Sequence, residues 1–465
     1  MYQYKGLEDT IAAIATPSGQ GGIGIIRLSG KEAITIADAV LCLSGPKKLK
    51  EQQSHSVHHG WVKESKNAEI IDEVLVVLMR GPKSYTAEDI VEINCHGGIT
   101  VLRTVLQAVL NAGARLATPG EFTKRAFLND RMDLAQAEAV LDIIHAKTET
   151  FLRQSHHQLK GELSTQLNII REELIKLYTM VEALINFPED GIDAQGRQQI
   201  GERVGTQEQS VSVLLKSAES GRILKEGIRI VLCGKPNVGK SSLLNALLKE
   251  QRAIVTDIAG TTRDILEESA QIKGIPISLV DTAGILEPRD LIEKEAVKRS
   301  QLYIKSADLV LLVLDHGRHL EAQDILLMEQ LKSARVLVVI NKVDLKEQLD
   351  LNSSEGRFNP NDVVKISALD PASIQELEAK IVEIIRREKD LDTHGILISN
   401  VRHIKALEEA QKNLHDACRL MKQDTSLEFI SEELKSAVNQ LDAITGRNID
   451  EDLLDRIFSE FCIGK

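Results

Sequence analysis

The chain has 465 residues, of which 43% are apolar and 27% are charged, and its formal net charge is −12. A chain of this length exceeds one ordinary hydrophobic core, so two or three domains are expected. The acidic balance excludes a whole-chain field that attracts nucleic acid, so any RNA contact must come from a local basic patch such as residues 47–50 or 222–229, each of which also reads as solvated surface.

The five cysteines are scattered and form no C-x-x-C pair, which argues against a structural zinc site and favours a reducing compartment. The N-terminus lacks a cationic segment followed by a long apolar one, and the run at residues 309–314 is far short of a membrane span. We therefore expect a soluble cytoplasmic protein that makes no membrane contact.

Residues 1–128 are expected to form a domain of short strands and helices. The pattern predicts strands at 10–15, 25–28, 74–79 and 91–94, and helices at 31–41 and 100–110. Gly19, Gly21, Gly22 and Gly24 read as a flexible loop. A dinucleotide-binding fingerprint is rejected here, because a strand follows these glycines where that fingerprint requires a helix.

Helical periodicity begins after residue 129. Apolar residues step by three and four from Leu159 to Leu184, which predicts a long amphipathic helix that ends near Phe187, before a proline. More helix is expected up to about residue 225, and again over 396–460. Neither of these two helical stretches is expected to bury its apolar face alone. The sequence therefore predicts one helical domain made of residues 129–226 and 389–465, with a domain of residues 227–388 inserted between its halves.

Residues 234–241 read Gly-Lys-Pro-Asn-Val-Gly-Lys-Ser and match the pattern of a phosphate-binding loop. An apolar strand pattern precedes the octapeptide, and helical spacing follows it. Such a turn directs backbone N–H groups toward an anion. Gly234 and Gly239 are expected to let the backbone approach the phosphates, Lys240 to reach the β- and γ-phosphates, and the Ser241 hydroxyl to bind Mg²⁺.

Two further motifs fit a nucleotide switch. Residues 260–264 read Gly-Thr-Thr-Arg-Asp, where a threonine can bind Mg²⁺ when a γ-phosphate is present. Residues 281–284 read Asp-Thr-Ala-Gly at the end of an apolar strand. The Asp281 carboxylate can hold the metal through water, and the Gly284 N–H can meet the γ-phosphate.

Two more motifs indicate guanine rather than adenine. Residues 341–344 read Asn-Lys-Val-Asp after the strand expected at 336–340, and Asp344 can accept from the guanine N1–H and 2-amino groups. Residues 367–369 read Ser-Ala-Leu and suit the purine O6 through backbone N–H groups. Four motifs in this order, at the ends of apolar strands, predict a GTP-binding domain.

The switch region lacks a familiar water-orienting group, because Ile285 occupies the position where small GTPases carry glutamine. An acidic residue further along is the alternative, although each one also reads as a solvated surface residue; the candidates are Glu287, Asp290, Glu293 and Glu295. Asn237 in the phosphate loop is equally consistent with a ligand for a monovalent cation and with a simple turn former.

Several stretches of the sequence carry a family resemblance: residues 9–13, 21–27, 86–92, 96–98, 119–129, 254–264 and the tail 461–465, Phe-Cys-Ile-Gly-Lys. On these stretches the chain resembles the MnmE (TrmE) family of bacterial tRNA-modification GTPases over essentially its whole length.

The resemblance implies a multidomain α/β and α protein. An α+β N-terminal domain, similar to the folate-binding domains of one-carbon enzymes, would dimerise and bind 5-formyltetrahydrofolate. A discontinuous helical domain would carry an inserted Ras-like P-loop GTPase. The homodimer would work with the flavoprotein MnmG (GidA), in a heterotetramer, to modify C5 of the wobble uridine of tRNA. Hydrolysis of GTP would need Mg²⁺ and K⁺ and would be activated when two G domains meet.

The resemblance also implies roles for individual residues. Folate contacts fall on Arg27, Glu92, Arg131 and Lys465; the K⁺ ligands are Asn237, Thr256, Ile258 and Thr261; and the Mg²⁺ ligands are Ser241 and Thr262. Glu293 would orient the attacking water, and Lys240 would act on the phosphates. The remaining expected nucleotide contacts are Val238, Gly239, Ser242, Asp257, Ala259, Gly260, Asp281, Thr282, Ala283, Gly284, Asn341, Lys342, Val343, Asp344, Ser367, Ala368 and Leu369.

Two positions stay open at this level. Leu286 departs from relatives that carry arginine there, which puts a role of that arginine in doubt. Cys462 reads either as a reactive thiol for one-carbon or uridine chemistry or as a small apolar residue. Alternative functions are a ribosome-assembly GTPase, which should carry a basic RNA-binding appendage, and a regulatory GTP switch without a direct role in modification.

Overall fold

The computed structural model describes residues 8–17, 19–64, 69–187, 194–250, 267–281, 302–350, 360–389, 395–423 and 425–465. It divides into two compact units. The first comprises Met1–Leu141, Leu159–Thr165 and Leu441–Lys465, and the second comprises Asp142–Gln158 and Gln166–Gln440. The domain boundaries expected at residues 128, 226 and 388 stay predictions.

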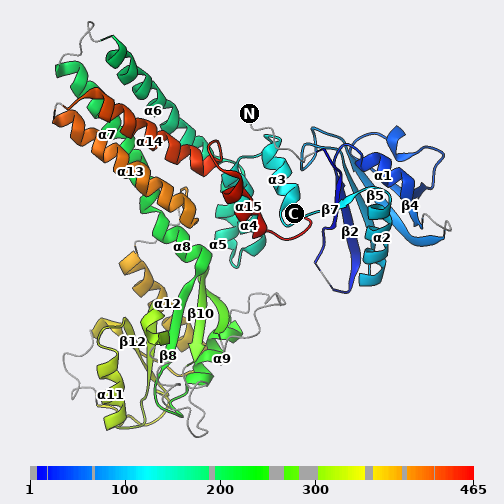
Figure 1. The fold of residues 1–465 in the computed structure, drawn as a ribbon. Helices are drawn as coiled ribbons and strands as arrows, with labels where there is room; N and C mark the ends of the chain where they lie inside the picture. The colour runs from blue at the N-terminus through cyan, green and yellow to red at the C-terminus, as the bar shows by residue number, and fades with distance from the viewer. Residues whose placement is uncertain are drawn as a thin grey trace, which may run out of the picture. The chain divides into compact units, whose positions relative to one another are not determined.

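The first unit is built on a seven-stranded sheet with the order β3-β4-β5-β6-β2-β1-β7. The strands are β1 Ile11–Ile14, β2 Gly21–Ser29, β3 Leu41–Leu43, β4 Ser56–Lys63, β5 Ile70–Met79, β6 Ile90–Gly97 and β7 Arg115–Leu116. Every pair is antiparallel except β1 with β7. Helices α1 (Ala33–Val40) and α2 (Ile99–Asn111) bury the apolar residues of one sheet face (Figure 1). The period of two along these strands therefore separates a buried face from an open one.

The glycines expected in a flexible loop mostly lie in strand β2, so that part of the prediction is wrong. Gly21 and Gly24 pair with β6, and Gly22 lies at the register shift between Gly21 and Ile23. A Cβ on Gly24 would lie 2.6 Å from the Leu102 side chain of α2, and a Cβ on Gly97 would lie 2.3 Å from the Gly21 carbonyl oxygen. These glycines are needed for close packing of a strand, which a local sequence pattern does not distinguish from loop flexibility.

Three helices complete the first unit: α3 Glu121–Leu128, α4 Leu134–His145 and α15 Glu451–Ser459. Leu454 and Phe458 of α15 and Phe461 beyond it are buried in a cluster with residues of α3 and α4. A Cβ on Gly120, whose φ is +66°, would lie 2.5 Å from the Phe458 carbonyl oxygen. Helix α15 confirms the end of the helical stretch expected over residues 396–460.

The second unit contains most of a helical bundle: α5 Glu149–Leu159, α6 Glu162–Asn186, α7 Ala194–Lys216, α8 Ala218–Glu226, α13 Val401–Lys422 and α14 Leu427–Thr445. The long helix ends at Asn186, as expected, but it begins at Glu162 rather than at Leu159. Gly161, with φ of +86°, separates it from α5. Apolar spacing continues across this break, so periodicity alone did not reveal it.

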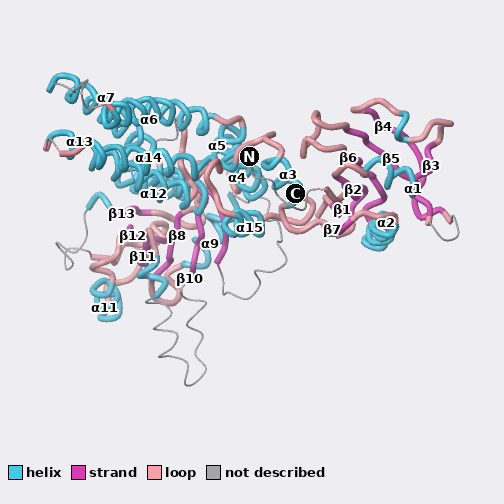
Figure 2. Tube along the Cα trace, turned by 45° about the horizontal axis from the view of Figure 1, so that its top comes forward, coloured by secondary structure: helices cyan, strands magenta, loops and turns pink. Residues whose placement is uncertain are grey.

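A six-stranded sheet with the order β13-β12-β11-β8-β10-β9 forms the rest of the second unit (Figure 2). The strands are β8 Ile228–Cys233, β9 Glu267–Ile272, β10 Ile275–Asp281, β11 Leu309–Asp315, β12 Val336–Asn341 and β13 Val363–Lys365, and the helices with it are α9 Lys240–Glu250, α11 Ala322–Gln330 and α12 Pro371–Lys389. Only β9 runs antiparallel to its neighbour. The central strand β11 is buried at every residue, as a sheet covered on both faces requires.

The carboxyl ends of β8, β10, β11 and β12 consequently meet at one edge of this sheet, where ligands of open α/β sheets bind. Over the described ranges, no helix is both long enough and apolar enough to cross a bilayer.

Candidate functional site

The phosphate loop connects β8 to the first residue of α9. Gly234 has φ of +147° and Gly239 has φ of +98°, and Asn237 between them adopts a left-handed backbone at +65°. A Cβ on Gly234 would lie 2.4 Å from the Val313 carbonyl oxygen, and a Cβ on Gly239 would lie 2.2 Å from Asn341 Nδ2. Glycine is thus required at both positions by backbone conformation and by packing.

Lys240 closes the loop on itself. Its Nζ donates to the carbonyl oxygens of Gly234 and Lys235, each 2.7 Å away. Burial lowers the pKa of the Lys240 ammonium, partly opposed by the Asp281 carboxylate. Asp281 ends β10 and is 7% exposed, and Ser241 lies exposed in the first turn of α9. A buried cation, a hydroxyl and a carboxylate at a helix N-terminus form a suitable environment for a phosphate with a bound Mg²⁺.

Asn341, at the end of β12, ties the phosphate loop to the segment after β13. Its Nδ2 donates to the Val238 carbonyl oxygen at 3.0 Å, and its Oδ1 accepts from the Ala368 N–H at 3.0 Å. The side chain is 1% exposed. Two of the sequence motifs are therefore joined through one buried amide, which has both of its polar ends satisfied.

Asp344 lies beside the segment that follows β13, because the Ser367 hydroxyl donates to its Oδ1 at 2.7 Å. Lys342, with φ of +66°, donates from Nζ to the Asn237 carbonyl oxygen and to Asp315 Oδ2, each at 2.7 Å. Leu369 is 84% exposed. The structure thus brings together residues from the phosphate loop, from 341–344 and from 367–369.

Sequence reasoning missed Asp315 at the end of β11. Burial alone would raise the pKa of its carboxyl, but hydrogen bonds from Lys342 and from the Gly317 N–H outweigh burial and lower it. An available signal was its position, since it is a polar residue at the carboxyl end of an apolar strand, like Asp281 and Asn341. Its role here is to hold Lys342.

The remaining expected switch residues lie outside the described residues: Thr256, Asp257, Ile258, Ala259, Gly260, Thr261, Thr262, Thr282, Ala283, Gly284, Ile285 and Glu293. In the part of the chain that is described, no three His, Cys, Asp or Glu side chains gather as a metal site. Ser241 and Asn237 are the expected metal ligands whose positions can be stated.

A second candidate site lies on the open face of the N-terminal sheet. Arg27 on β2 faces Glu92 on β6 in the strand register, and Arg27 Nε donates to Glu92 Oε1 at 2.8 Å. Arg27 Nη1 also donates to the Gly464 carbonyl oxygen at 3.0 Å. Both side chains stay partly exposed, at 17% and 18%. The last residues of the chain therefore reach the same place as two residues of the sheet.

Tyr85 forms the centre of this second site and was missed by sequence reasoning. The guanidinium of Arg27 lies 5.8 Å from the Tyr85 ring centroid and that of Arg131 lies 5.3 Å from it, while Phe122 is 5.7 Å from Arg27. The Tyr85 hydroxyl is 2.8 Å from Thr123 Oγ1, and burial raises the pKa of the phenol. Two guanidiniums within 6 Å of one ring centroid are favourable cation–π contacts. A sequence signal for Tyr85 was available, because the residue directly precedes the stretch 86–92 that carries the family resemblance.

The C-terminal tail is held by backbone hydrogen bonds. The Gly120 N–H donates to the Cys462 carbonyl oxygen at 3.3 Å, and the Phe122 N–H donates to that of Lys465 at 3.2 Å. Gly464 has φ of +95°, and a Cβ there would lie 2.4 Å from the Ile14 carbonyl oxygen. Burial, followed by repulsion from Arg27, lowers the pKa of the Lys465 ammonium. The second site thus combines three cationic side chains and one carboxylate with two aromatic rings. This combination suits a ring-containing ligand with anionic groups. The residues are Arg27, Arg131, Lys465, Glu92, Tyr85 and Phe122.

A buried network of ion pairs around Arg125 contacts the segments that carry the aromatic rings of the second site. Arg125 is fully buried and contacts Asp9 at 2.6 Å, Glu88 at 3.2 Å and Glu121 at 3.1 Å. Arg115 also donates to Glu121, at 2.5 Å. Because Glu88 and Glu121 belong to the segments that carry Tyr85 and Phe122, the network fixes both aromatic rings in place.

The thiols differ in accessibility. All five are free, and burial raises the pKa of Cys95 to about 12 and that of Cys418 to about 11, which makes thiolate chemistry unfavourable at both. Cys462 is exposed in the tail. Of these three cysteines, Cys462 alone is both accessible and near a candidate site.

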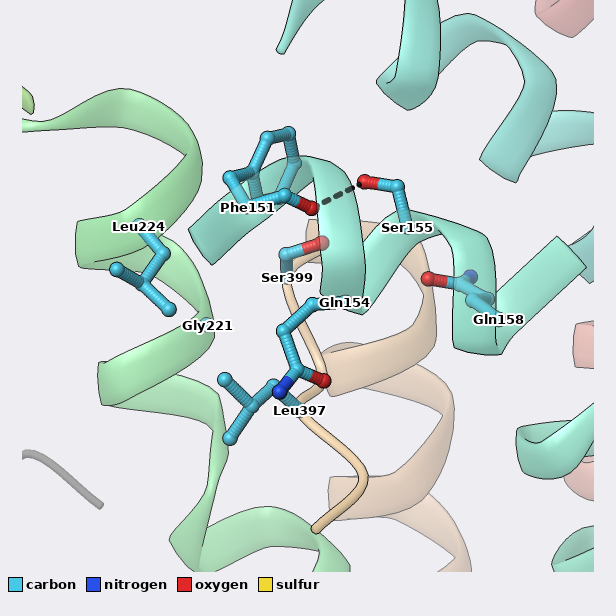
Figure 3. A pocket seen from close by; sticks show the side chains of 8 residues that line it. All are labelled: Phe151, Gln154, Ser155, Gln158, Gly221, Leu224, Leu397 and Ser399. Carbon is cyan, nitrogen blue, oxygen red and sulfur yellow. Dashed lines mark hydrogen bonds between the residues drawn. The ribbon is translucent and has the colours of Figure 1, made fainter. Parts of the chain in front are cut away.

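A small hollow in the helical unit is not a ligand site. It lies between α5, α8 and the segment before α13, is lined by residues including Phe151, Leu224 and Leu397, and is no larger than one water molecule (Figure 3). Its significance is structural, since Ser217 Oγ accepts from the Ile398 N–H at 3.1 Å and a Cβ on Gly221 would lie 2.3 Å from the Ile398 carbonyl oxygen. The chain segments that enter and leave the six-stranded domain are joined there.

Comparisons with known proteins cover nearly all of the chain. The model described as "GTP-binding protein TrmE N-terminus" matches residues 10–131, and that described as "MnmE helical domain" matches residues 134–462. Proteins named tRNA modification GTPase MnmE are 45% identical over 459 residues in Alkaliphilus metalliredigens and 42% identical over 458 residues in Bacillus subtilis. These alignments cover 99% and 98% of this chain, respectively, and 100% of each relative.

Solved structures match over smaller parts of the chain. The G domain of the T. maritima FeoB iron transporter is 30% identical, covering 34% of this chain and 98% of that one with a TM-score of 0.26. An Era variant from Aquifex aeolicus bound to GDP·AlF4⁻ is 28% identical, covering 40% of this chain and 66% of that one, also with a TM-score of 0.26.

Proposed function

Because the chain belongs to the MnmE family of tRNA modification GTPases, we propose that it is the GTP-hydrolysing component of a system that modifies C5 of the wobble uridine in tRNA. The observation that carries this proposal is the single edge at which the phosphate loop, Asn341 and Asp344 meet. That edge provides the cation for phosphates and the carboxylate for guanine in one site.

In this proposal the nucleotide is held by the residues named above. Lys240 leaves its two loop carbonyls for the β- and γ-phosphates, while Ser241 and Thr262 bind Mg²⁺ and Asp281 holds the ion through water. Asp344 accepts from the guanine N1–H and 2-amino groups, and backbone N–H groups of residues 367–369 bind O6. Adenine lacks that pair of donors, so GTP is preferred over ATP.

Hydrolysis depends on K⁺ and on pairing of two G domains. Asn237, Thr256, Ile258 and Thr261 bind the cation, which supplies the positive charge that an arginine finger gives elsewhere. Glu293 orients the attacking water in place of the absent glutamine. Of these four residues the structure describes Asn237, which is exposed on the phosphate loop and therefore accessible to a cation.

A reduced folate such as 5-formyltetrahydrofolate binds the second site. Glu92 accepts from the pterin-like ring, and Arg27, Arg131 and Lys465 bind its anionic or polar groups. The cationic surroundings of the Tyr85 ring support this ligand class. Cys462 is the accessible thiol for any covalent step.

Two copies of the chain associate through the N-terminal sheet, and the homodimer joins the flavoprotein MnmG in a heterotetramer. The sheet face opposite α1 and α2 supports the homodimer, because Ile23, Val57 and Leu75 are 66%, 61% and 50% exposed on strands of that face. Large apolar side chains exposed on one sheet face are typical of association surfaces. We place the system in the cytoplasm, where the five free thiols remain reduced.

Cation dependence tests the hydrolytic part of this proposal. The full-length protein should hydrolyse GTP much faster in K⁺ than in Na⁺, and the rate per molecule should rise with protein concentration. Asn237→Ala should abolish the difference between the two cations, and Glu293→Ala should slow turnover while GTP still binds. Equal rates in both cations would remove K⁺ from the mechanism and favour an alternative regulatory or ribosome-assembly GTP switch.

A further inference from the structure

A short turn in the N-terminal domain carries three lysines at its surface. Leu49 begins the 3-10 turn Leu49–Glu51 and is fully buried in the core of the sheet domain. Lys47, Lys48 and Lys50 around it are exposed. The buried leucine anchors the turn, and the three ammonium groups consequently remain at the surface.

Hydrogen bonds from two other elements hold this turn. The carboxylate of Asp38 on α1 accepts from the Leu49 N–H at 2.7 Å and from the Lys50 N–H at 3.1 Å. Arg80, after β5, donates from Nη2 to the Lys50 carbonyl oxygen at 2.8 Å. The turn is thus held at both its N–H and its C=O groups, so little backbone conformational entropy remains to be lost when a ligand binds.

The nearby carboxylates are already engaged with backbone groups. Both oxygens of Asp38 accept from the turn, and Glu51 Oε2 accepts from the Lys48 N–H at 3.0 Å. Among the described residues, no carboxylate lies within ion-pair distance of the Lys47, Lys48 or Lys50 ammonium. Four cationic side chains, those of Lys47, Lys48, Lys50 and Arg80, therefore lie around two carboxylates, which leaves a local excess of positive charge in a chain of net charge −12.

We propose that Lys47, Lys48 and Lys50, the lysine platform, bind phosphates of the tRNA backbone and hold the RNA on the domain that carries the Arg27 site. The inference rests on the proposed function for its ligand, which must be a tRNA. Lysines present point charges that bind phosphate without reading sequence, so the platform positions the RNA rather than selecting it. An acidic protein partner fits less well, because the only apolar residue of the turn is buried, and protein interfaces need an apolar core.

The test is the salt dependence of tRNA binding by the full-length protein. The affinity for unmodified tRNA should fall in Lys47→Gln/Lys48→Gln/Lys50→Gln. The slope of log K against log salt should become shallower by about 2–3, since each lost phosphate contact removes about 0.7–0.9. Lys47→Arg/Lys48→Arg/Lys50→Arg should retain the wild-type slope, and GTP hydrolysis without tRNA should be unchanged in both variants.

A matched control carries the same change of net charge on exposed lysines elsewhere: Lys305→Gln/Lys332→Gln/Lys412→Gln. It should keep the wild-type affinity and slope. If the wild-type protein binds tRNA and the glutamine platform variant binds it equally well, the platform is overturned and the proposed function stands. If the wild-type protein binds no tRNA, with or without its partner, the proposed function itself fails.

Discussion

The guanidinium of Arg27 donates a hydrogen bond to the carbonyl oxygen of Gly464, 3.0 Å away and 437 positions later in the chain. The same guanidinium donates to Glu92, so one side chain connects the open face of the N-terminal sheet to the C-terminal tail. The C-terminal tail is consequently part of the second site. Changes in the last residues of the chain should therefore alter ligand binding at this site.

Removal of the last four residues should abolish folate binding and leave the GTP site intact. Deleting residues 462–465 eliminates the Gly464 acceptor, the Lys465 ammonium and the Cys462 thiol from the Arg27 site, while the nucleotide contacts lie in the other compact unit. The measurement is calorimetry with 5-formyltetrahydrofolate beside K⁺-dependent GTP hydrolysis and wobble-uridine modification. Normal modification by the truncated protein would contradict a role of the tail in the reaction.

A single substitution separates the position of the tail from its presence. Gly464→Ala places a Cβ 2.4 Å from the Ile14 carbonyl oxygen at a φ of +95°, so the tail must shift. The strain is on the order of 1–3 kcal/mol, and folate affinity should fall about tenfold or more. Ile463→Ala is the matched control, because Ile463 is 53% exposed, and it should bind folate as the wild type does.

Tyr85 should contribute to the folate site through its ring rather than its hydroxyl. Two guanidiniums lie within 6 Å of the ring centroid, and each such contact is worth about 0.5–1 kcal/mol. Tyr85→Leu should therefore weaken folate binding about tenfold, whereas Tyr85→Phe keeps the ring and should change it little. Equal affinities of the two variants, measured by calorimetry, would show that the ring plays no part.

Asp344→Asn should convert a preference for GTP into one for xanthosine triphosphate. The substitution replaces an acceptor of two guanine hydrogen bonds with an amide, which costs about 1.5–3 kcal/mol, or roughly 10- to 150-fold in GTP affinity. The Ser367 hydroxyl can still donate to the amide oxygen, so the local fold should persist. Competition binding with GTP, ATP and XTP gives the result, and an unchanged order of affinities would refute the assignment of the 341–344 motif.

The N-terminal unit should lose stability in acid because of its buried ion network. Burial alone would raise the pKa of Glu121, but hydrogen bonds from Arg115, the Thr118 N–H and Arg125 outweigh it, so the pKa is lowered in the folded state. A lowered carboxyl pKa gives stability that is present above the ordinary value of 4.5 and is lost as the pH falls below it. Glu121→Gln should cost about 1–3 kcal/mol at pH 7 and flatten the acid dependence.

The chain provides a local probe for this measurement. Its single tryptophan, Trp61, lies on β4 of the same unit, so its fluorescence reports unfolding of the N-terminal sheet. Urea unfolding should be followed from pH 7 to pH 3.5. A parallel decline of Glu121→Gln and the wild-type protein would exclude Glu121 as the group responsible.

The sequence was sufficient for elements whose signal is local. The strands that precede the Gly234 loop, Asp281 and Asn341 were placed correctly, because buried parallel strands read as apolar runs with a turn at one end. Tyr85 and Asp315 were missed because their roles come from partners distant in sequence, Arg27 and Lys342. No local pattern encodes such pairings, and the same holds for the tail, whose place was expected only from the family resemblance.

The proposed function requires that this chain uses GTP in the modification of the wobble uridine of tRNA. Mass spectrometry of nucleosides in tRNA from cells that lack the chain tests it most directly, with complementation by the wild-type gene and by Asp344→Asn. The C5-modified wobble uridines should disappear, return with the wild-type chain and not return with Asp344→Asn at ordinary nucleotide levels. Undiminished C5 modification in cells without the chain would contradict the proposed function.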